Sequence, residues 1–237
     1  MTTGIGTYNE KPLHASLKEL YRRSGDRTEV PIDGYVVDIL RGGLIIEIQT
    51  ANFSSVARKM RDLASRHRVR LVYPVPEERW IVKLPAAADG KTLRRRSPKR
   101  AGMEDIFAEL VSFPDLIAHK NFELEVILTR EEQLRRFDGR RGRSRRGWVV
   151  IERRLLDTTD RLLIRSPGDL VRLLPSDLPE PFHTLDLATS FGRSRALAQK
   201  VAYCLRKCNL ITAVGKDANA VLYSRTIAEG SWAAAPR

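Results

Sequence analysis

The sequence has only two cysteines and no apolar run long enough to cross a membrane. Without neighbouring histidines, Cys204 and Cys208 are too few for a structural zinc site, so we expect two buried, reduced thiols. A membrane-spanning helix needs about 20 apolar residues in succession. The first six residues also lack the charged and then apolar segments of a secretion signal. These absences predict a soluble, cytoplasmic protein without a membrane partner.

Acidic residues are scarce relative to basic ones. The 237-residue chain has 42 lysines and arginines against 29 aspartates and glutamates, which gives a formal net charge of +13. Such a surplus predicts a polyanionic partner, above all a nucleic acid. A membrane surface would satisfy the charge too, but the sequence has no strong basic amphipathic anchor. The 42% of hydrophobic residues suits a globular chain with one sizeable domain and a small one.

A glycine turn between two apolar segments organises the N-terminal part of the chain. Residues 31–49 form two β-rich runs around Arg41-Gly42-Gly43, which is the pattern of a hairpin. The first strand carries Asp38 and the second carries Glu47. Because side chains two residues apart in a strand point the same way, Glu47 and Gln49 share one face, and the isoleucines beside them face the core.

The two acids of this hairpin indicate a metal site. Carboxylates that meet at the ends of adjacent strands provide the hard oxygen ligands that Mg²⁺ prefers. An apolar strand also has little reason to carry a glutamate that is not paired, solvated or metal-bound. The alternative is an ordinary hairpin whose acids are solvated.

The pattern of Asp38, a short turn and then Glu47-x-Gln49 resembles the PD-(D/E)xK nuclease superfamily. The resemblance implies that Asp38 and Glu47 bind Mg²⁺, with Mn²⁺ as an alternative, and that the residue two after the glutamate orients the attacking water. That residue is usually lysine in the superfamily and is Gln49 here, as in some restriction enzymes. Lys59, on the next expected helix, could replace the missing lysine or could be an ordinary solvated charge.

The elements around the hairpin follow the order of the same superfamily. We expect a helix over 9–21, strands over 28–32, 69–74 and 80–84, and a second helix that begins near Asn52 or Ser54. This order predicts an α/β fold with a restriction-endonuclease-like αβββαβ core and a mixed sheet, over residues 1–85. The phrase Glu10-Lys11-Pro12-Leu13 further implies that Glu10 approaches the metal; alternatively, Glu10 only complements the helix dipole.

Two dense basic segments, residues 91–100 and 136–147, lie in the middle of the chain, and we expect both to be loops. They could contact phosphates or simply be solvated. A short helix over 104–113 and strands over 122–129, 148–152 and 162–165 are expected around them. Residues 86–166 either extend the sheet or form a separate unit. The arginines predicted to contact phosphates are Arg94, Arg95, Arg96, Arg140, Arg141, Arg145 and Arg146.

Residues 167–226 predict a second, smaller domain. We expect a brief helix over 167–174, helices over 184–190 and 195–207 with caps at Thr184 and Ser194, and strands over 210–214 and 220–223. Two helices around a glycine turn, followed by a hairpin, resemble a winged helix-turn-helix domain. Its outward helix face would offer Arg195, Gln199 and Arg206 to DNA bases, and its wing would offer Lys216. The alternative is that this domain binds protein. Residues 227–237 are expected to be a disordered tail.

The sequence therefore predicts a metal-dependent DNA endonuclease, with catalytic residues Glu10, Asp38, Glu47 and Gln49 and a winged helix that grips double-stranded DNA. Two alternatives stay open: a non-catalytic DNA-binding regulator on a nuclease-derived fold, and an RNA-processing nuclease. A homodimer is also left open.

Overall fold

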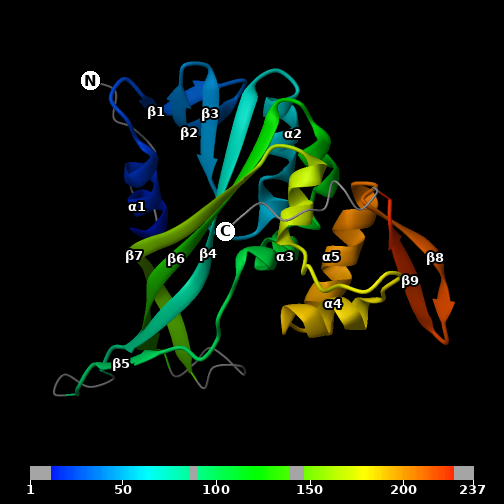
Figure 1. Cartoon of the computed structure of the whole chain (residues 1–237). Coiled ribbons are helices and arrows are strands. Elements are labelled where there is room, and N and C mark those ends of the chain that lie inside the picture. Colours follow the sequence, from blue (N-terminus) through cyan, green and yellow to red (C-terminus); the bar gives the residue numbers. More distant parts are fainter. Residues whose placement is uncertain (1–11, 86–89, 139–146, 227–237) are drawn as a thin grey trace. The chain divides into compact units, whose positions relative to one another are not determined.

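The computed structural model describes residues 12–85, 90–138 and 147–226 (Figure 1). Its elements begin with α1 (Pro12–Tyr21), β1 (Arg27–Ile32), β2 (Tyr35–Arg41), β3 (Leu44–Ile48), η2 (Phe53–Ser55), α2 (Ala57–Ala64), β4 (Arg68–Lys83) and β5 (Leu93–Arg96). They continue with η3 (Met103–Ile106), α3 (Phe107–Leu110), η4 (Pro114–Ala118), β6 (Phe122–Phe137), β7 (Trp148–Ile164), η5 (Pro167–Leu173), α4 (Thr184–Phe191), α5 (Arg195–Lys207), β8 (Ile211–Asp217) and β9 (Ala220–Arg225).

The described strands form a seven-stranded mixed sheet and a separate two-stranded sheet. The order in the large sheet is β1-β2-β3-β4-β6-β7, with β5 beside β4, while β8 pairs with β9. The pairs β1–β2 and β2–β3 are antiparallel. Between β4 and β6, the amides of Val69 and Leu84 donate to the carbonyls of Asn121 and Arg135, so these strands run parallel. The expected α/β class with a mixed sheet is confirmed.

The chain divides into two compact units, which we describe separately. Unit 1 comprises residues 1–50, 72–102 and 127–161, and unit 2 comprises residues 51–71, 103–126 and 162–237. The long strands β4 and β6 contribute residues to both units.

Two tight hairpins fix the register of β1, β2 and β3 in unit 1. The turn between β1 and β2 has positive φ at Asp33 (48°) and Gly34 (79°), and the turn between β2 and β3 has positive φ at Gly42 (48°) and Gly43 (84°). Two-residue hairpin loops of type I′ need positive φ at both positions. The hairpin expected around Gly42 and Gly43 is therefore confirmed.

Helix α1 packs against the sheet of unit 1 through one apolar stripe. Leu13, Leu17 and Tyr21 are buried, whereas Leu20 is 48% exposed. The stripe belongs to one core cluster with residues from four strands, namely Ile39, Ile46, Ile48, Val72 and Ile127. Ile46 and Ile48 thus face the core, as the period of two predicts.

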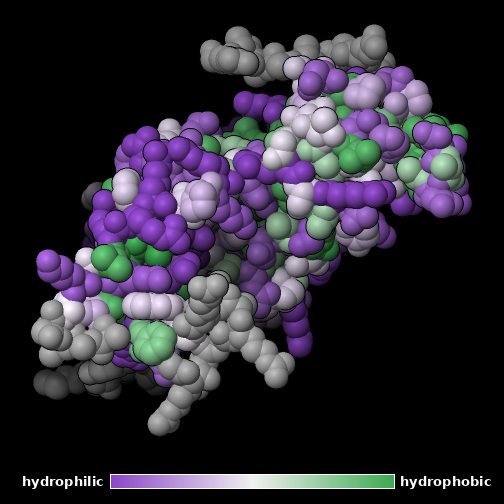
Figure 2. Space-filling model, turned by 90° about the horizontal axis from the view of Figure 1, so that it is seen from below, coloured by the Kyte–Doolittle hydropathy of each residue, from purple (hydrophilic) through white to green (hydrophobic). Residues whose placement is uncertain are grey.

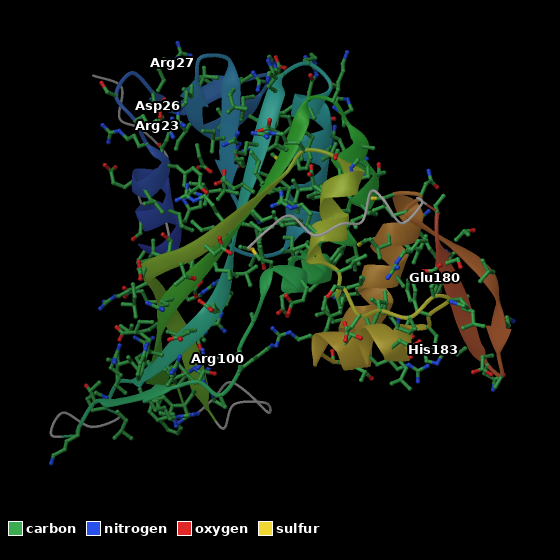
Figure 3. The ribbon with its side chains drawn as sticks, in the orientation of Figure 1. Arg23, Asp26, Arg27, Arg100, Glu180 and His183 are labelled. Atoms are coloured by element: carbon green, nitrogen blue, oxygen red, sulfur yellow. The ribbon has the colours of Figure 1, made fainter. Side chains whose placement is uncertain are left out.

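The C-terminal end of α1 is tied to the β2–β3 hairpin by Arg41. Its guanidinium donates to both carboxylate oxygens of Asp26, from Nε to Oδ1 at 3.0 Å and from Nη2 to Oδ2 at 2.7 Å, and also to the Tyr21 carbonyl. Asp26 lies in the connection between α1 and β1 (Figure 3), and its side chain is only 3% exposed. This interaction satisfies one of the carbonyls that a helix end leaves unpaired.

Aromatic stacking forms much of the core of unit 2. The rings of Phe53 and Phe113 stack with centroids 5.1 Å apart, and Phe122 meets Phe113 edge-on at 6.0 Å. All three side chains are fully buried. On the surface of unit 2, Arg61 makes two hydrogen bonds to Asp115.

The C-terminal part of unit 2 contains α4, α5 and the β8–β9 hairpin, close to the expected bounds. Gly192 (φ 60°) separates the helices, and Asn209 (φ 56°) follows the end of α5. Ser194 caps α5 as expected, by accepting from the Leu197 amide at 3.3 Å. The cap of α4 is His183, not Thr184: its ring accepts from the Asp186 amide, and Asp186 accepts in return from the His183 amide. Figure 3 labels His183 at the start of this helix.

Several expected strand boundaries are wrong. The strands expected over 69–74 and 80–84 are one strand, β4, and those expected over 148–152 and 162–165 are one strand, β7. The first expected strand was to end at Pro74, but Pro74 and Pro76 both lie within β4.

The basic segment over 91–100 contains a strand and is not entirely a loop. Residues 93–96 form β5, whose register pairs Trp80 with Arg96 and Lys83 with Leu93. All four residues of β5 are exposed. The backbone bonds to β4 therefore form without burial of the arginines, an outcome that basic composition alone does not predict.

We expect Asp26→Asn to lower the free energy of unfolding by about 1.5–3 kcal/mol, the usual contribution of hydrogen bonds to a charged group. The hydrogen bonds from Arg41 hold the pKa of Asp26 below its ordinary value in the folded protein. This contribution is therefore fully present above the unfolded pKa of about 3.9 and is lost as the pH falls through the lower folded pKa.

Urea unfolding at pH 7 and at decreasing pH below 4 measures this difference. The matched control is Glu19→Gln, which removes an exposed pair with Arg22 (3.4 Å) and should change the stability by less than about 0.5 kcal/mol. Equal destabilisation by both substitutions at pH 7 would contradict the account of Arg41 and Asp26.

Candidate active site and nucleic-acid interface

Asp38 and Glu47 lie on the adjacent strands β2 and β3 in unit 1. The register of this hairpin runs from Arg41–Leu44 to Ile39–Ile46, and Asp38 and Glu47 are the next residues on either strand. The Glu47 side chain is buried at 6% exposure, and the Asp38 side chain is 16% exposed. The structure thus brings two of the predicted site residues to adjacent strands at the end of one ladder.

The backbone that follows Glu47 is held by three strands. The Ile48 amide donates to Oδ2 of Asp38 on β2 at 2.8 Å. The Gln49 amide donates to the Val72 carbonyl on β4 at 2.9 Å. The Thr50 carbonyl accepts from Nη1 of Arg153 on β7 at 3.2 Å. The position of Gln49 therefore does not depend on the hairpin alone.

Arg153 is itself fixed by a buried glutamate. Its Nε and Nη2 each donate to Glu131 on β6 at 2.9 Å, and the Glu131 side chain is fully buried. Thr129 donates to the same carboxylate at 3.0 Å, and Arg79 on β4 lies 3.7 Å from it. Sequence reasoning missed this network because its four residues come from three strands that are far apart in the sequence.

The donor chemistry at Asp38 and Glu47 fits a hard divalent cation. Mg²⁺ keeps several waters and is usually bound by one or two carboxylates together with substrate phosphates. Among residues 12–85, 90–138 and 147–226, no cluster of three or more His, Cys, Asp or Glu side chains is placed to hold a metal ion. Glu10, the third predicted ligand, lies outside the described residues.

His14 on α1 is a neighbour of Asp38 that sequence reasoning missed. Its Nε2 lies 3.2 Å from Asp38 Oδ2, and its side chain is 22% exposed. A signal was present in the sequence, because His14 follows Glu10 by four residues, a spacing that places two residues on one face of a helix.

The arginines of β5 are exposed, and two of them pair with glutamates of unit 1. Arg94 donates to Glu132 at 2.9 Å and lies 4.1 Å above the Trp80 ring. Arg96 and Arg100 both pair with Glu78, and Figure 3 labels Arg100. A phosphate would have to compete with these carboxylates. Arg95 is exposed as well, whereas Arg140, Arg141, Arg145 and Arg146 lie outside the described residues.

The outward face of α5 is polar and exposed, as the sequence predicts. Arg195, Gln199 and Arg206 are exposed there, while Leu197, Val201 and Leu205 are buried on the other side. Lys216 is exposed on β8. Hydrophilic side chains also dominate the molecular face drawn in Figure 2. The predicted DNA-contacting residues of this region are therefore accessible within unit 2.

The hairpin of unit 2 has a further partner. The backbones of Phe182 and Tyr223 form two hydrogen bonds, of 2.9 and 2.7 Å, so Phe182, two residues before α4, pairs with β9. Their rings lie 6.0 Å apart. The chain thus runs from the isolated β-bridge at Phe182 through α4 and α5 into β8 and β9.

The two cysteines have no features of a reactive site. Burial raises the pKa of Cys204 to about 12 and that of Cys208 to about 11, so both are protonated at neutral pH. The Cys208 thiol donates to the Pro114 carbonyl at 3.3 Å. Both thiols are free; Cys204 is fully buried, as expected, whereas Cys208 is only partly buried.

Comparison with known proteins shows a family. Residues 11–165, more than half of the chain, match the model described as "Domain of unknown function (DUF8091)". The chain belongs to the DUF8091 family. An uncharacterised protein of Treponema pallidum (strain Nichols) is 33% identical over 187 residues, which cover 78% of this chain and 73% of that protein. No solved structure matches the chain significantly.

The DUF8091 match covers both acids of β2 and β3, together with His14, Glu131 and Arg153. It ends just before η5, so α4, α5 and the β8–β9 hairpin lie beyond it. In the described part of the chain, no helix is long and apolar enough to span a membrane.

Proposed function

We propose that this DUF8091 protein is a divalent-metal-dependent nuclease that hydrolyses DNA, with Asp38 and Glu47 as its metal-binding carboxylates. The observation that carries the proposal is that these acids lie on adjacent strands, each next to the last register pair, Ile39–Ile46. A buried glutamate beside a second carboxylate is costly unless a cation or donors compensate it.

The arrangement of elements supports the proposal. The chain order α1, β1, β2, β3, α2, β4 agrees with the αβββαβ core of the PD-(D/E)xK superfamily, and β1 to β4 are successive neighbours in the sheet. In that core the metal-binding acids lie on the second and third strands, as Asp38 and Glu47 do. The resemblance rests on topology and motif, and Gln49 departs from the usual lysine.

The residues of the site have distinct roles in this proposal. Asp38 and Glu47 supply hard oxygen ligands, and a bound Mg²⁺ would supply charge stabilisation and an acidified water. Gln49 can both donate to and accept from a water molecule, so its amide can orient the nucleophile. It carries no positive charge, and the sequence offers Lys59 as the second candidate for that role.

DNA is the substrate that the charge and unit 2 support best. The net charge is +13, and the exposed face of α5 combines arginine with glutamine, the residue types that bind base edges in pairs of hydrogen bonds. We propose that α4, α5 and the β8–β9 hairpin form a winged helix-turn-helix, with Phe182 as its first short strand. In this proposal α5 enters the major groove and Lys216 contacts the backbone.

A second candidate function is a DNA-binding regulator without catalysis. Two observations favour it: Gln49 replaces the usual lysine, and Asp38 Oδ2 already accepts from the Ile48 amide. An RNA-cleaving enzyme is a further alternative, because basic surfaces do not distinguish RNA from DNA. Cleavage assays on duplex DNA, single-stranded DNA and RNA separate the three functions.

With Mg²⁺ or Mn²⁺, we expect the wild-type protein to cut DNA and Glu47→Ala to abolish cutting while DNA binding stays nearly intact. The reason is that Glu47 contributes to metal binding and not to the DNA-contacting surface. Gel-based cleavage and fluorescence anisotropy measure the two properties.

Glu47→Gln, which keeps the size of the buried side chain, should lose cutting to the same extent. The control is Glu29→Ala on β1, which removes a pair with Lys18 (2.8 Å) and should retain activity. Equal cutting by wild type and Glu47→Ala on every substrate would refute the proposal, and no cutting by either would favour the regulator.

Gln49→Lys should keep or raise the cleavage rate, because lysine is the usual residue at this position in the superfamily. Single-turnover cleavage at saturating Mg²⁺ measures the rate. The comparison is Lys59→Ala in the wild-type and Gln49→Lys backgrounds: if Lys59 supplies the missing charge, its removal should cost less in the Gln49→Lys protein. Complete loss of cutting by a folded Gln49→Lys protein would show that the site is arranged differently.

Removal of Arg195 should change which DNA sequences or structures are preferred, at a cost of about 1–3 kcal/mol for a lost base contact. Removal of Arg140 and Arg141 should instead weaken binding to all sequences alike. It should also flatten the salt slope by about 0.9 log units per lost phosphate contact. Salt titrations on several duplexes distinguish the two effects. If Arg195→Ala leaves affinity and preference unchanged on every duplex, α5 is not a DNA-reading helix.

A further inference from the structure

Asp38 receives contacts from two different elements at one oxygen. The Ile48 amide of β3 donates to Oδ2 at 2.8 Å, and Nε2 of His14 on α1 lies 3.2 Å from the same atom. An ionised carboxylate can only accept hydrogen bonds, and the His14 tautomer with a proton on Nε2 can donate one to Asp38 in this contact.

The orientation of an aspartate carboxylate is weakly defined by its own torsions. The last torsion of Asp is broad and roughly two-fold, so external donors decide where the two oxygens point. Donors from α1 and β3 approach the same oxygen from separate elements. Together they hold the carboxylate plane in one orientation at the end of the β2–β3 register.

The position of α1 does not depend on His14. Leu13 and Leu17 are buried in the core of unit 1, and Lys18 pairs with Glu29 at 2.8 Å. Arg41 ties the end of the helix to the hairpin through the Tyr21 carbonyl. The His14 side chain is 22% exposed and so adds little buried apolar surface. Removal of the His14 side chain should therefore leave α1 packed on the sheet and should change only the orientation of the Asp38 carboxylate.

We propose that His14 is a positioning residue that orients the Asp38 carboxylate for a divalent cation. This inference rests on the proposed function, because it assigns His14 a role at the same site. Groups that hydrogen-bond to metal ligands orient them, and their loss typically weakens metal affinity by about 10–100-fold.

The test is calorimetric titration of the full-length protein with Mn²⁺ in the absence of DNA. Wild type, His14→Ala, His14→Gln and Lys18→Ala are compared, with thermal unfolding of each protein as a check on folding. His14→Ala should weaken Mn²⁺ binding by about 10-fold or more. His14→Gln should restore most of the affinity, because the glutamine amide nitrogen can donate from nearly the same place as Nε2. Lys18→Ala, one turn further along α1, should bind like wild type.

The outcomes separate this inference from the proposed function. If wild type does not bind Mn²⁺, the proposed metal site fails and the inference fails with it. If wild type binds and His14→Ala binds equally well, the metal site stands and His14 has no positioning role. A His14→Gln protein as weak as His14→Ala would also overturn the inference. Should His14→Ala not fold, His14→Met, which keeps bulk without a donor, takes its place with the same expected loss.

Discussion

The hydrogen bond from the Ile48 amide to the Asp38 carboxylate is the interaction on which the proposed site depends. It lies just beyond the paired residues of β2 and β3 and joins the Asp38 side chain to the strand that carries the buried Glu47. A charge-assisted bond of this kind contributes about 1.5–3 kcal/mol. The same bond would serve a purely structural aspartate, so the proposed cation site requires Asp38 and Glu47 together.

The rest of unit 1 holds this point from several sides. The apolar stripe of α1 and the clamp of Arg41 on Asp26 fix the helix that carries His14. On β6 and β7, the Glu131–Arg153 pair fixes the Thr50 carbonyl just after Gln49. A buried ion pair is weak support for stability, because desolvation offsets its attraction. Its effect here is to hold the chain at the end of β3, through the bond from Arg153 to the Thr50 carbonyl.

Local patterns predicted the hairpins, α1 and α5, because turn residues and apolar periodicity determine these elements within a few residues. The glycine turn alone also placed Asp38 and Glu47 on adjacent strands. Long-range effects were not predictable: β5 forms an exposed strand against β4, and β4 continues past Pro74. His14, Arg153 and Glu131 were missed for the same reason, since each acts on a residue that is distant in sequence. Apolar residues alone do not define the buried face of α1, because Leu20 is exposed while Leu17 and Tyr21 are buried.

The most direct test of the metal site is a crystal structure of the wild-type protein soaked with Mn²⁺, with an anomalous difference map. Our account predicts a peak between Asp38 and Glu47, about 2.0–2.2 Å from one oxygen of each carboxylate. The Asp38→Asn protein, soaked in the same way, should show a weaker peak or none. Ordered Asp38 and Glu47 carboxylates without a peak between them, at a Mn²⁺ concentration that supports cleavage, would contradict the central claim.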